Sequence, residues 1–421
     1  MDSKSASKQA NTEKKLQKVY KRHQRIWSFF WHTAKPFFKW KYGYTAELAP
    51  EIDGPCLILA NHNCNLDPVL VGFSFRKQMY FVASEHVYRQ GFVSKLLFWG
   101  FEPIAKMKGT TDTLAVMKAI RTLRNGKNVC IFPEGNRSFN GRTGPIFDAT
   151  GKLVKTSGAT LVTYKIEGGY FTNPRWGYKI RKGKCTGKVV NIYKPEQLKE
   201  MDAAEITACV RRDLDENAYE RQKQNPIRYK GKNLAQGMEC ALCVCPKCRE
   251  VGTIASKANT VFCKKCGLST SYSEYCYFDD DFPFHTVEEW DLWQDEYFKT
   301  YIEENKDSSK VLFEDSDMTM KTITADHKEE VVGCGTLSLY NDRLEFKPVI
   351  QAGSSANAGT ETASDAQPVI VPISEITDIA LFLKDNLVFS NVAGTHYEVK
   401  GTTLKNVRKY VHVCKFIKEK N

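Results

Sequence analysis

The sequence predicts an α/β domain with a mostly parallel sheet flanked by helices, followed by a cysteine-rich domain and a small β-rich module closed by a helix. Three observations lead to this prediction. From Pro55 onward, short apolar runs alternate with segments of helical periodicity. Six of the 14 cysteines fall within residues 240–266. After Gly333 the pattern changes to short alternating runs separated by turn residues.

Composition and charge narrow the class of protein. The 421 residues are 42% hydrophobic and 26% charged, which excludes a largely disordered chain. Residues 1–273 carry a net charge of +24, residues 274–330 carry −13, and residues 331–421 carry +1, which sum to the +12 of the whole chain. A basic front portion suits an anionic partner, such as nucleic acid, an anionic membrane or a phosphorylated substrate; the alternative is that the charge serves solubility alone. Since no apolar run approaches the ~20 residues needed to span a bilayer, and the start lacks a secretory signal, we expect a cytoplasmic protein.

An aromatic and basic segment precedes the α/β pattern. Residues 1–22 are polar and rich in lysine, and residues 26–44 interleave nine aromatic residues with lysines. Aromatic rings with basic neighbours favour the membrane–water interface, although the same residues would also suit a helix packed on the domain by its aromatic face. We expect residues 1–48 to form an arm that associates with an anionic membrane surface. The protein would then be peripheral on the inner face of the membrane.

Residues 49–238 are predicted to form the α/β domain. Four apolar runs are predicted as strands: residues 56–61, 79–84, 128–135 and 159–168. Residues 112–123 have helical spacing, with four apolar side chains expected on one face: Leu114, Met117, Ile120 and Leu123. Thr111 or Asp112 is the candidate cap of this helix. A polar helix around residues 202–224 is expected near the end of the domain.

Two polar segments follow directly after predicted strands. Residues 61–68 are Asn-His-Asn-Cys-Asn-Leu-Asp-Pro, and residues 132–138 are Phe-Pro-Glu-Gly-Asn-Arg-Ser. Open α/β sheets place their sites at the carboxyl ends of strands, so both segments are candidates for a site. His62 can take a proton from a hydroxyl at neutral pH, and Asp67, five residues on, can orient its ring across a turn. The Arg137 guanidinium suits phosphate oxygens.

These two segments resemble the paired signatures of the glycerolipid acyltransferase superfamily, whose best-known members are 1-acylglycerol-3-phosphate acyltransferases. The signatures are His62-x4-Asp67 and Phe132–Ser138, and the resemblance covers about residues 49–225. It implies transfer of a fatty acyl group from an acyl thioester, either acyl-CoA or acyl carrier protein, to the hydroxyl of a lysophospholipid. With 1-acylglycerol-3-phosphate as the acceptor, the product would be phosphatidic acid for phospholipid synthesis.

The resemblance also assigns roles to residues. His62 would be the general base and Asp67 the residue that orients it, and the acceptor hydroxyl would attack directly, without an acyl-enzyme. The residues that would hold the acceptor and its phosphate are Lys106, Glu134, Gly135, Arg137 and Ser138. Lys106 stands where the family has an arginine, which keeps the charge and loses the bidentate geometry. Thr163 replaces the usual proline of an apolar block that implies acyl-chain packing.

Several alternatives remain open at this point. Cys64, between His62 and Asp67, invites a covalent mechanism. The pair could also be a buried histidine beside a capping aspartate, or belong to an inactive copy of the family. The acceptor could be another lysophospholipid or an aminolipid of the ornithine-lipid type. Finally, the protein could be a membrane adaptor that keeps the acyltransferase fold without turnover.

Residues 239–275 are predicted to form a zinc ribbon. The pattern is C-x2-C-x14-C-x2-C, with four candidate thiolate ligands: Cys245, Cys248, Cys263 and Cys266. Four thiolates close the coordination shell of Zn²⁺, so the metal would be structural. Cys240 and Cys243 form a third C-x2-C pair that could exchange with one of these, and reduced core cysteines are the metal-free alternative. A basic front with a ribbon also suits nucleic acid, but we expect no nucleic-acid partner, since such ribbons are common protein-interaction modules.

The rest of the chain divides into an acidic linker and a small module. Residues 276–330 are expected to hold one helix, 287–304, followed by a solvated stretch. Residues 331–421 resemble, by pattern alone, a pleckstrin-homology-like or GRAM-like module, with a hairpin turn at Asn341-Asp342. Residues 352–367 are of low complexity and are expected to be a disordered loop. The closing helix is predicted to bury one face: Val407, Val411, Cys414 and Ile417.

Overall fold

The computed structural model describes residues 3–89, 91–106, 113–324, 328–349, 367–403 and 406–420. The chain divides into two compact units. Unit 1 holds most of residues 1–231, and unit 2 holds residues 232–421 together with residues 175–179. Among the described helices, none combines the length and the hydrophobicity that crossing a bilayer requires.

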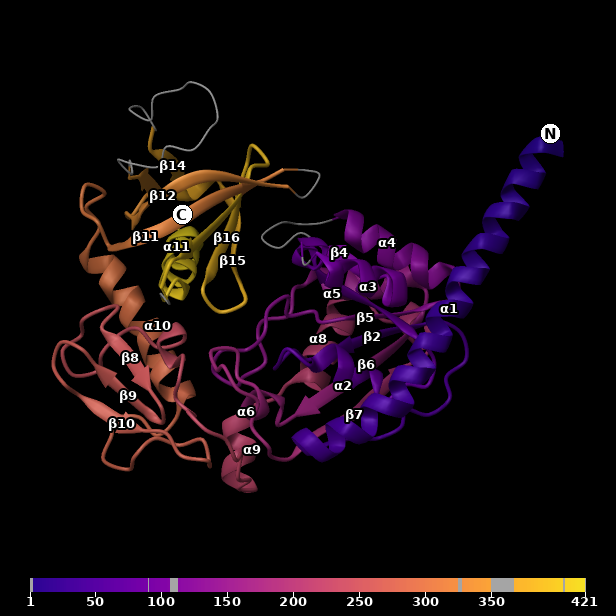
Figure 1. The fold of residues 1–421 in the computed structure, drawn as a ribbon, viewed down its shortest axis with the longest axis horizontal. Coiled ribbons are helices and arrows are strands. Elements are labelled where there is room, and N and C mark those ends of the chain that lie inside the picture. The colour runs from indigo at the N-terminus through magenta and orange to yellow at the C-terminus, as the bar shows by residue number, and fades with distance from the viewer. Residues whose placement is uncertain are drawn as a thin grey trace. The chain divides into compact units, whose positions relative to one another are not determined.

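Unit 1 is built on a seven-stranded sheet in the order β1-β7-β6-β2-β5-β3-β4 (Figure 1). Its strands are β1 (Tyr44–Ala46), β2 (Cys56–Ala60), β3 (Met79–Ser84), β4 (Ile104–Lys106), β5 (Asn128–Ile131), β6 (Thr160–Glu167) and β7 (Cys185–Tyr193). The five strands from β6 to β4 run parallel, whereas β7 is antiparallel to β6, and β1 is parallel to β7. The predicted mostly parallel sheet is therefore confirmed, and each of the four predicted strands is present. The predicted strands did not include β1, β4 or β7.

The two faces of this sheet bury different side chains because successive residues of a strand point to opposite sides. In β2, Ile58 and Ala60 join one core cluster, and Leu57 and Leu59 join the other. Helices α1 (Ser3–Tyr42) and α2 (Asp67–Gly72) cover the first face. Three helices cover the second face: α4 (Thr113–Arg124), α5 (Ala149–Ser157) and α8 (Ala203–Leu214). Shorter helices complete the unit: η1 (Glu85–Arg89), α3 (Phe92–Phe101), α6 (Gly169–Thr172), α7 (Pro195–Glu200) and α9 (Ala218–Gln224).

The basic arm and the aromatic segment form one helix, α1, which has two apolar faces. One face belongs to the core. Trp27 is only 4% exposed, its indole N–H donates to the Phe75 carbonyl oxygen at 3.2 Å, and its ring lies where a side chain on Gly72 would clash. The opposite face leaves three aromatic side chains exposed: Phe29, Phe37 and Trp40. Only part of the aromatic segment is thus available to a membrane, and deleting the arm would also remove part of the core.

The predicted core face of α4 is partly wrong. Ile120 and Leu123 are buried as expected, but Leu114 is 81% exposed and Met117 is 53% exposed. The remaining buried positions of this helix are the small residues Ala115 and Ala119, which allow α4 to lie close to the sheet. The buried face is therefore rotated about the helix axis, away from Leu114 and Met117 and toward the alanines. The candidate caps Thr111 and Asp112 lie outside the described residues.

Unit 2 begins with a short segment, η2 (Met238–Cys240), and a three-stranded antiparallel sheet in the order β10-β9-β8. These strands are β8 (Ile254–Lys257), β9 (Thr260–Cys263) and β10 (Ser269–Ser271). The helix predicted at 287–304 is α10 (Val287–Glu304), at the predicted bounds. The solvated stretch expected after it is wrong, because β11 (Phe313–Ile323) is a strand there. Register shifts within β11 break the alternation of its buried residues, which is why the sequence pattern did not indicate a strand.

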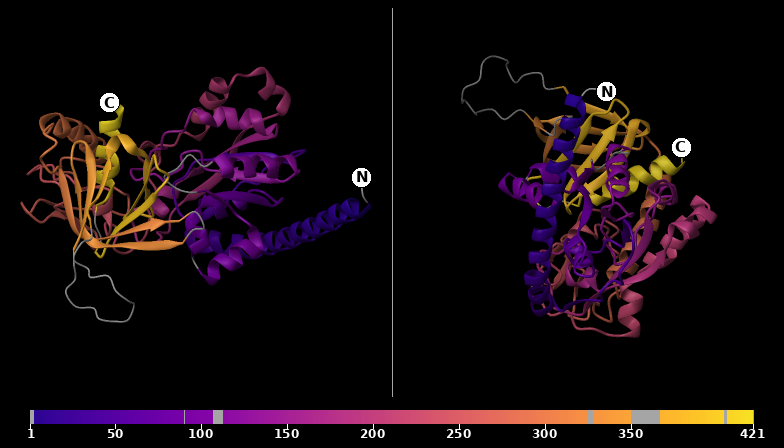
Figure 2. Two further views of the ribbon diagram at one scale, coloured as in Figure 1. Left: turned by 90° about the horizontal axis from the view of Figure 1, so that it is seen from above. Right: turned by 90° about the vertical axis from the view of Figure 1, so that its right-hand side faces the viewer.

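The C-terminal module is a seven-stranded antiparallel sheet in the order β14-β13-β12-β11-β17-β16-β15. Its strands after β11 are β12 (Glu329–Leu339), β13 (Arg343–Pro348), β14 (Val369–Pro372), β15 (Ile376–Phe382), β16 (Asn386–Asn391) and β17 (His396–Gly401), with η3 (Ile373–Glu375) between β14 and β15. The sheet is curled, and α11 (Arg408–Lys420) lies against it (Figure 2). The hairpin at Asn341-Asp342 and the buried face of α11 are confirmed. Of the expected disordered loop, all but Gln367 lies outside the described residues.

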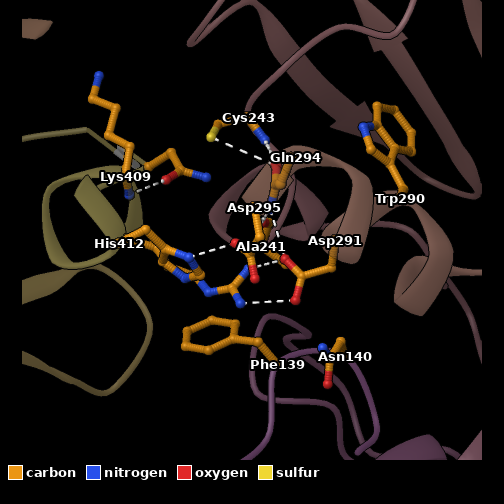
Figure 3. Close-up of polar contacts among 12 residues, drawn as sticks. Phe139, Asn140, Ala241, Cys243, Trp290, Asp291, Gln294, Asp295, Lys409 and His412 are labelled. Carbon is orange, nitrogen blue, oxygen red and sulfur yellow. Dashed lines mark hydrogen bonds and ion pairs between the residues drawn. The ribbon is translucent and has the colours of Figure 1, made fainter. Parts of the chain in front are cut away.

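A buried ionic cluster joins α10, α11 and the cysteine-rich segment within unit 2 (Figure 3). Arg408 forms a two-pronged ion pair with Asp291, with one bond of 2.8 Å, and also donates to the Ala241 carbonyl oxygen at 3.0 Å. Gln294 donates to the same carbonyl at 2.8 Å and accepts from the Cys243 N–H at 3.1 Å. Because these groups satisfy one another away from water, α10 is a core element of unit 2 rather than an exposed linker.

Candidate active site

The two polar segments meet at one edge of the unit 1 sheet. β2 and β5 are neighbouring parallel strands, so their carboxyl ends lie side by side. Residues 61–68 follow β2, and residues 132–138 follow β5. The main chains of the two segments bond directly, because the Ser138 N–H donates to the His62 carbonyl oxygen at 3.0 Å. The structure thus brings the two signatures together as the sequence predicted.

His62 and Asp67 form a hydrogen-bonded pair at this edge of the sheet. Nδ1 of His62 lies 2.7 Å from Oδ2 of Asp67. The Asp67 side chain is fully buried, whereas 21% of the His62 side chain is exposed. A carboxylate oxygen accepts hydrogen bonds, so this contact suits the tautomer of His62 that carries its proton on Nδ1 and its lone pair on Nε2. The imidazole also stacks on Phe132, with ring centroids 4.4 Å apart, which limits its rotation.

Asp67 is held in place by the turn that it follows. Its Oδ2 also accepts the backbone N–H groups of Asn63 at 2.6 Å and Cys64 at 2.8 Å. Oδ1 accepts from the Cys64 thiol at 3.0 Å. The negative charge of Asp67 and, above all, burial raise the pKa of this thiol well above its usual value. A fully buried, protonated thiol is a poor nucleophile, so the geometry disfavours the covalent alternative at Cys64.

Glu134 has partners that differ from the expected acceptor. Its Oε1 accepts the His62 N–H at 2.6 Å, and its Oε2 accepts the Gly144 N–H at 2.6 Å. Burial raises the pKa of Glu134 from 4.5 to about 8, and the two N–H donors oppose the shift. The carboxyl group therefore ties the His62 main chain to the loop after β5. This role could not be predicted from the sequence, because every residue except proline supplies a backbone N–H. The residue types of the partners therefore do not reveal the contact.

If the chain catalyses the acyl transfer that the resemblance implies, replacing Glu134 with Gln is expected to reduce kcat more than it raises the acceptor KM. The amide has one oxygen, so either the His62 or the Gly144 N–H would face an NH₂ group and lose its acceptor. An unsatisfied buried donor costs ~1–3 kcal/mol, which corresponds to a rate loss of about 5- to 150-fold if the strain reaches His62. The exposed Glu196→Gln on α7 is the matched control and should change neither parameter. The measurement is steady-state kinetics with each substrate varied in turn. A change in the acceptor KM alone would indicate that Glu134 contacts the acceptor.

The other predicted residues of the second signature have distinct positions. Gly135 adopts φ +66°, which favours glycine in this turn. Ser138 is buried, and its hydroxyl accepts the Gly141 N–H at 2.8 Å, so it shapes the loop. Arg137 lies close enough to Asp67 for the two charges to interact, while burial lowers the pKa of the guanidinium. Of these three, Arg137 is the only cation, and it directly precedes Ser138, whose N–H bonds to the His62 carbonyl oxygen.

Lys106 and Thr163 stand apart from this pair. Lys106 ends β4, which lies two strands from β5, or about 10 Å across the sheet. Thr163 is fully buried in β6 and donates to Asp213 at 2.9 Å. The threonine in place of the usual proline therefore bonds inside the domain core, which gives no support to acyl-chain packing at that residue.

The four predicted metal ligands of unit 2 converge. The sulfur atoms of Cys245, Cys248, Cys263 and Cys266 all lie within 4.8 Å of one another. The Cys245–Cys266 pair is 3.6 Å apart and the Cys248–Cys263 pair 3.8 Å apart. Four sulfurs bound tetrahedrally at ~2.3 Å from Zn²⁺ would be separated by about 3.8 Å, so the donor set fits this ion.

The backbone around these cysteines repeats in the two C-x2-C turns. The Arg249 N–H donates to the Cys245 carbonyl oxygen at 2.9 Å, and the Gly267 N–H donates to that of Cys263 at 3.1 Å. Both donors adopt left-handed conformations, with φ of 61° for Arg249 and 73° for Gly267. Cys243, from the third C-x2-C pair, instead bonds Gln294 and is not in the cluster. The geometry therefore favours the predicted four ligands over the exchange with Cys240 or Cys243.

Comparison with known proteins agrees with the first site. Residues 43–167 match the profile of the Acyltransferase family. This acyltransferase segment runs from before β1 to the end of β6 and contains His62, Asp67, Glu134 and Arg137.

Similar proteins share the segment at low identity. A chloroplastic 1-acyl-sn-glycerol-3-phosphate acyltransferase of Brassica napus is 25% identical over 127 residues, which cover 29% of this chain and 36% of the relative. A 1-acyl-sn-glycerol-3-phosphate acyltransferase of Borreliella burgdorferi is 26% identical over 107 residues, which cover 25% of this chain and 43% of the relative. This chain thus spans about two fifths of the length of each curated relative. The solved 1-acyl-sn-glycerophosphate acyltransferase of Thermotoga maritima has a TM-score of 0.38 at 19% identity, covering 46% of this chain and 78% of that one.

Proposed function

We propose that this protein transfers a fatty acyl group from an acyl thioester to the hydroxyl of a lysophospholipid. The observation that carries the proposal is the His62–Asp67 pair at 2.7 Å, with its ring partly exposed and Arg137 close by. The acyltransferase segment supports the reaction class, and the names of the two curated relatives favour 1-acylglycerol-3-phosphate as the first acceptor to test. The product would then be phosphatidic acid.

The geometry supports a direct transfer. Nε2 of His62 accepts the proton of the acceptor hydroxyl while the oxygen attacks the thioester carbonyl carbon. The tetrahedral intermediate then expels the thiolate. The imidazolium gives its proton to this thiolate, so that a thiol and an ester are the products. Asp67 stabilises the imidazolium and keeps its orientation, as in a hydrolase triad. In this scheme Glu134 and Ser138 are positioning residues, because they hold the main chain of His62.

Replacing Arg137 with Ala is expected to raise the KM of the acceptor far more than that of the acyl donor. The guanidinium would pair with the acceptor's phosphate, and a lost charge-assisted bond of ~1.5–3 kcal/mol corresponds to about 10- to 150-fold in affinity. Lys106→Arg should be tolerated, since it keeps the positive charge at the end of β4 and adds a bidentate fork. Kinetics with each substrate varied in turn is the measurement. An equal effect of Arg137→Ala on both substrates would place the phosphate elsewhere.

A screen of donors and acceptors tests the proposed reaction. Release of free thiol from acyl-CoA or acyl carrier protein is measured with 1-acylglycerol-3-phosphate, with other lysophospholipids and with an ornithine lipid precursor. We expect release only when a hydroxylated lipid acceptor is present, and fastest with an acceptor that bears a phosphate monoester. If the protein binds these lipids but releases no thiol from any donor, the result would instead support a membrane adaptor without turnover.

We also propose that unit 2 holds one structural Zn²⁺. The support is the fit of four cysteine sulfurs to tetrahedral coordination and the repeated backbone turns around them. Thr253 Oγ1 lies 3.2 Å from the Cys263 sulfur, where its hydroxyl can donate to a thiolate and support that ligand. Four thiolates leave no open position for a substrate, so the metal would stabilise the fold and take no part in acyl transfer.

A further inference from the structure

Helix α3 presents an apolar face to the solvent. Phe92, Leu96 and Trp99 follow one another at steps of four and three residues, so they share one side of the helix. Their exposed fractions are 79%, 54% and 53%. The side toward the domain instead carries the small residues Ser94 and Gly100, both buried. Phe101, the last residue of α3, also packs on the domain core, so the helix is apolar on both sides, and such an exposed apolar face indicates a binding surface.

Two basic side chains lie beside this face. Lys95 is exposed on the same helix, and the Arg22 guanidinium of α1 lies over the Trp99 ring, 5.0 Å from its centroid. α1 packs on α3 near this point, because His23 contacts the Trp99 carbonyl oxygen at 3.1 Å. The outward face of α3 therefore adjoins the side of α1 on which Arg22 lies.

That side of α1 is basic in its first half and aromatic in its second. Lys18, Arg22, Arg25 and Phe29 follow at steps of four, three and four residues, and Trp40 lies three helical turns beyond Phe29. Phe29 and Trp40 are 72% and 68% exposed. Within residues 3–42 there are 11 basic residues and a single acidic one. An apolar stripe beside a strongly basic helix is complementary to an anionic lipid surface.

We propose that α3 inserts its outward face into the interfacial layer of an anionic bilayer, while the basic residues of α1 contact the lipid headgroups. This rests on the proposed function in so far as the acceptor is a membrane lipid. A second copy of the chain is a poorer occupant, because it would bring two α1 helices with 11 basic residues each together. Trp and Phe are favoured at the headgroup level, which suits Trp99 and Phe92.

The position of α3 in the chain links this surface to the site. α3 ends at Phe101, and β4 begins at Ile104 and ends at Lys106. The helix that enters the bilayer thus leads directly into the strand that ends at the predicted phosphate-binding lysine. An acceptor lipid would reach this edge of the sheet without its acyl chain crossing water.

Co-sedimentation with vesicles tests the proposal. The full-length protein should bind vesicles of phosphatidylcholine with phosphatidylglycerol, and the double variant Leu96→Ser, Trp99→Ser should bind at least tenfold more weakly, since it removes two apolar side chains from the stripe. The matched control is Val331→Ser, an exposed apolar residue on β12 of unit 2. Equal binding of the double variant and the wild type would overturn the proposal. A wild-type dimer that the double variant abolishes, without vesicle binding, would overturn it in favour of a second copy.

Activity separates this proposal from the proposed function. The double variant should be slow with an acceptor embedded in vesicles and retain wild-type rates with a short-chain acceptor dissolved as monomers. Vesicle binding that depends on Leu96 and Trp99 in a protein without turnover would support the docking surface and reject the acyltransferase. Loss of turnover with both acceptors, in a variant with a wild-type melting curve, would contradict a role limited to docking.

Discussion

Replacing His62 with Ala is expected to lower acyl transfer by ~10²–10⁴-fold, the usual contribution of a general base. The fold should survive, since His62 lies in a loop at the sheet edge and its bonds to Glu134 and Ser138 use only the main chain. Asp67→Asn should also be severe. The carboxylate accepts from Nδ1 of His62 and from two backbone N–H groups, and an amide in its place would disturb the imidazole orientation.

The controls for this pair are a melting curve and a conservative change nearby. Cys64→Ser should keep most of the activity, because a hydroxyl can replace the thiol as the donor to Asp67 and no acyl-enzyme is required. Turnover is measured by thiol release from the acyl donor. Full activity in His62→Ala, or complete loss in a well-folded Cys64→Ser, would contradict the assignment of the base.

Replacing Cys245 with Ser is expected to release the metal and to destabilise unit 2. The purified protein should carry one Zn²⁺ per chain, and the variant should carry none, because a single missing thiolate opens the tetrahedral shell. The loss should reach beyond the ribbon. Within the ribbon segment, the Ala241 carbonyl oxygen accepts a hydrogen bond from Arg408 of α11. The Val244 carbonyl oxygen accepts one from Trp290 of α10.

Two further cysteine variants sharpen the metal test. Cys240→Ser should retain the zinc, since Cys240 is not in the cluster of four sulfurs. Cys334→Ser, which changes an exposed thiol on β12, is the control and should also retain it. Metal content by mass spectrometry and thermal unfolding with and without a chelator are the measurements. A Cys245→Ser protein that keeps its zinc, or a wild type that is equally stable without metal, would remove the role assigned to the ribbon.

The local parts of the site could be predicted from the sequence, because the interactions are short in range or fixed by strand direction. His62 and Asp67 are five residues apart in one turn. Their meeting with residues 132–138 follows from two apolar runs that are both parallel strands. The C-x2-C pairs were recognisable for the same reason, since each turn presents two sulfurs regardless of its surroundings.

The remaining features depend on tertiary packing that leaves little trace in the sequence. Glu134 was expected at the acceptor, but its partners are two backbone N–H groups that any residue supplies. Leu114 and Met117 fit a helical stripe, yet both are exposed, and the alanines beside them are buried in the core. The aromatic segment divides between the core and the surface, with Trp27 buried and Phe29 exposed two positions later. Only the structure shows which side of α1 faces the sheet.

In the proposed function, acyl transfer takes place at the edge formed by β2 and β5. It is tested most directly by incubating the purified protein with 1-acylglycerol-3-phosphate and an acyl thioester whose acyl chain carries an isotope label, and analysing the lipids by mass spectrometry. We predict phosphatidic acid that carries the label in one chain, formed by the wild type at least a hundredfold faster than by His62→Ala. Equal rates for the two proteins, or no labelled ester with any hydroxylated lysophospholipid, would contradict the proposed function.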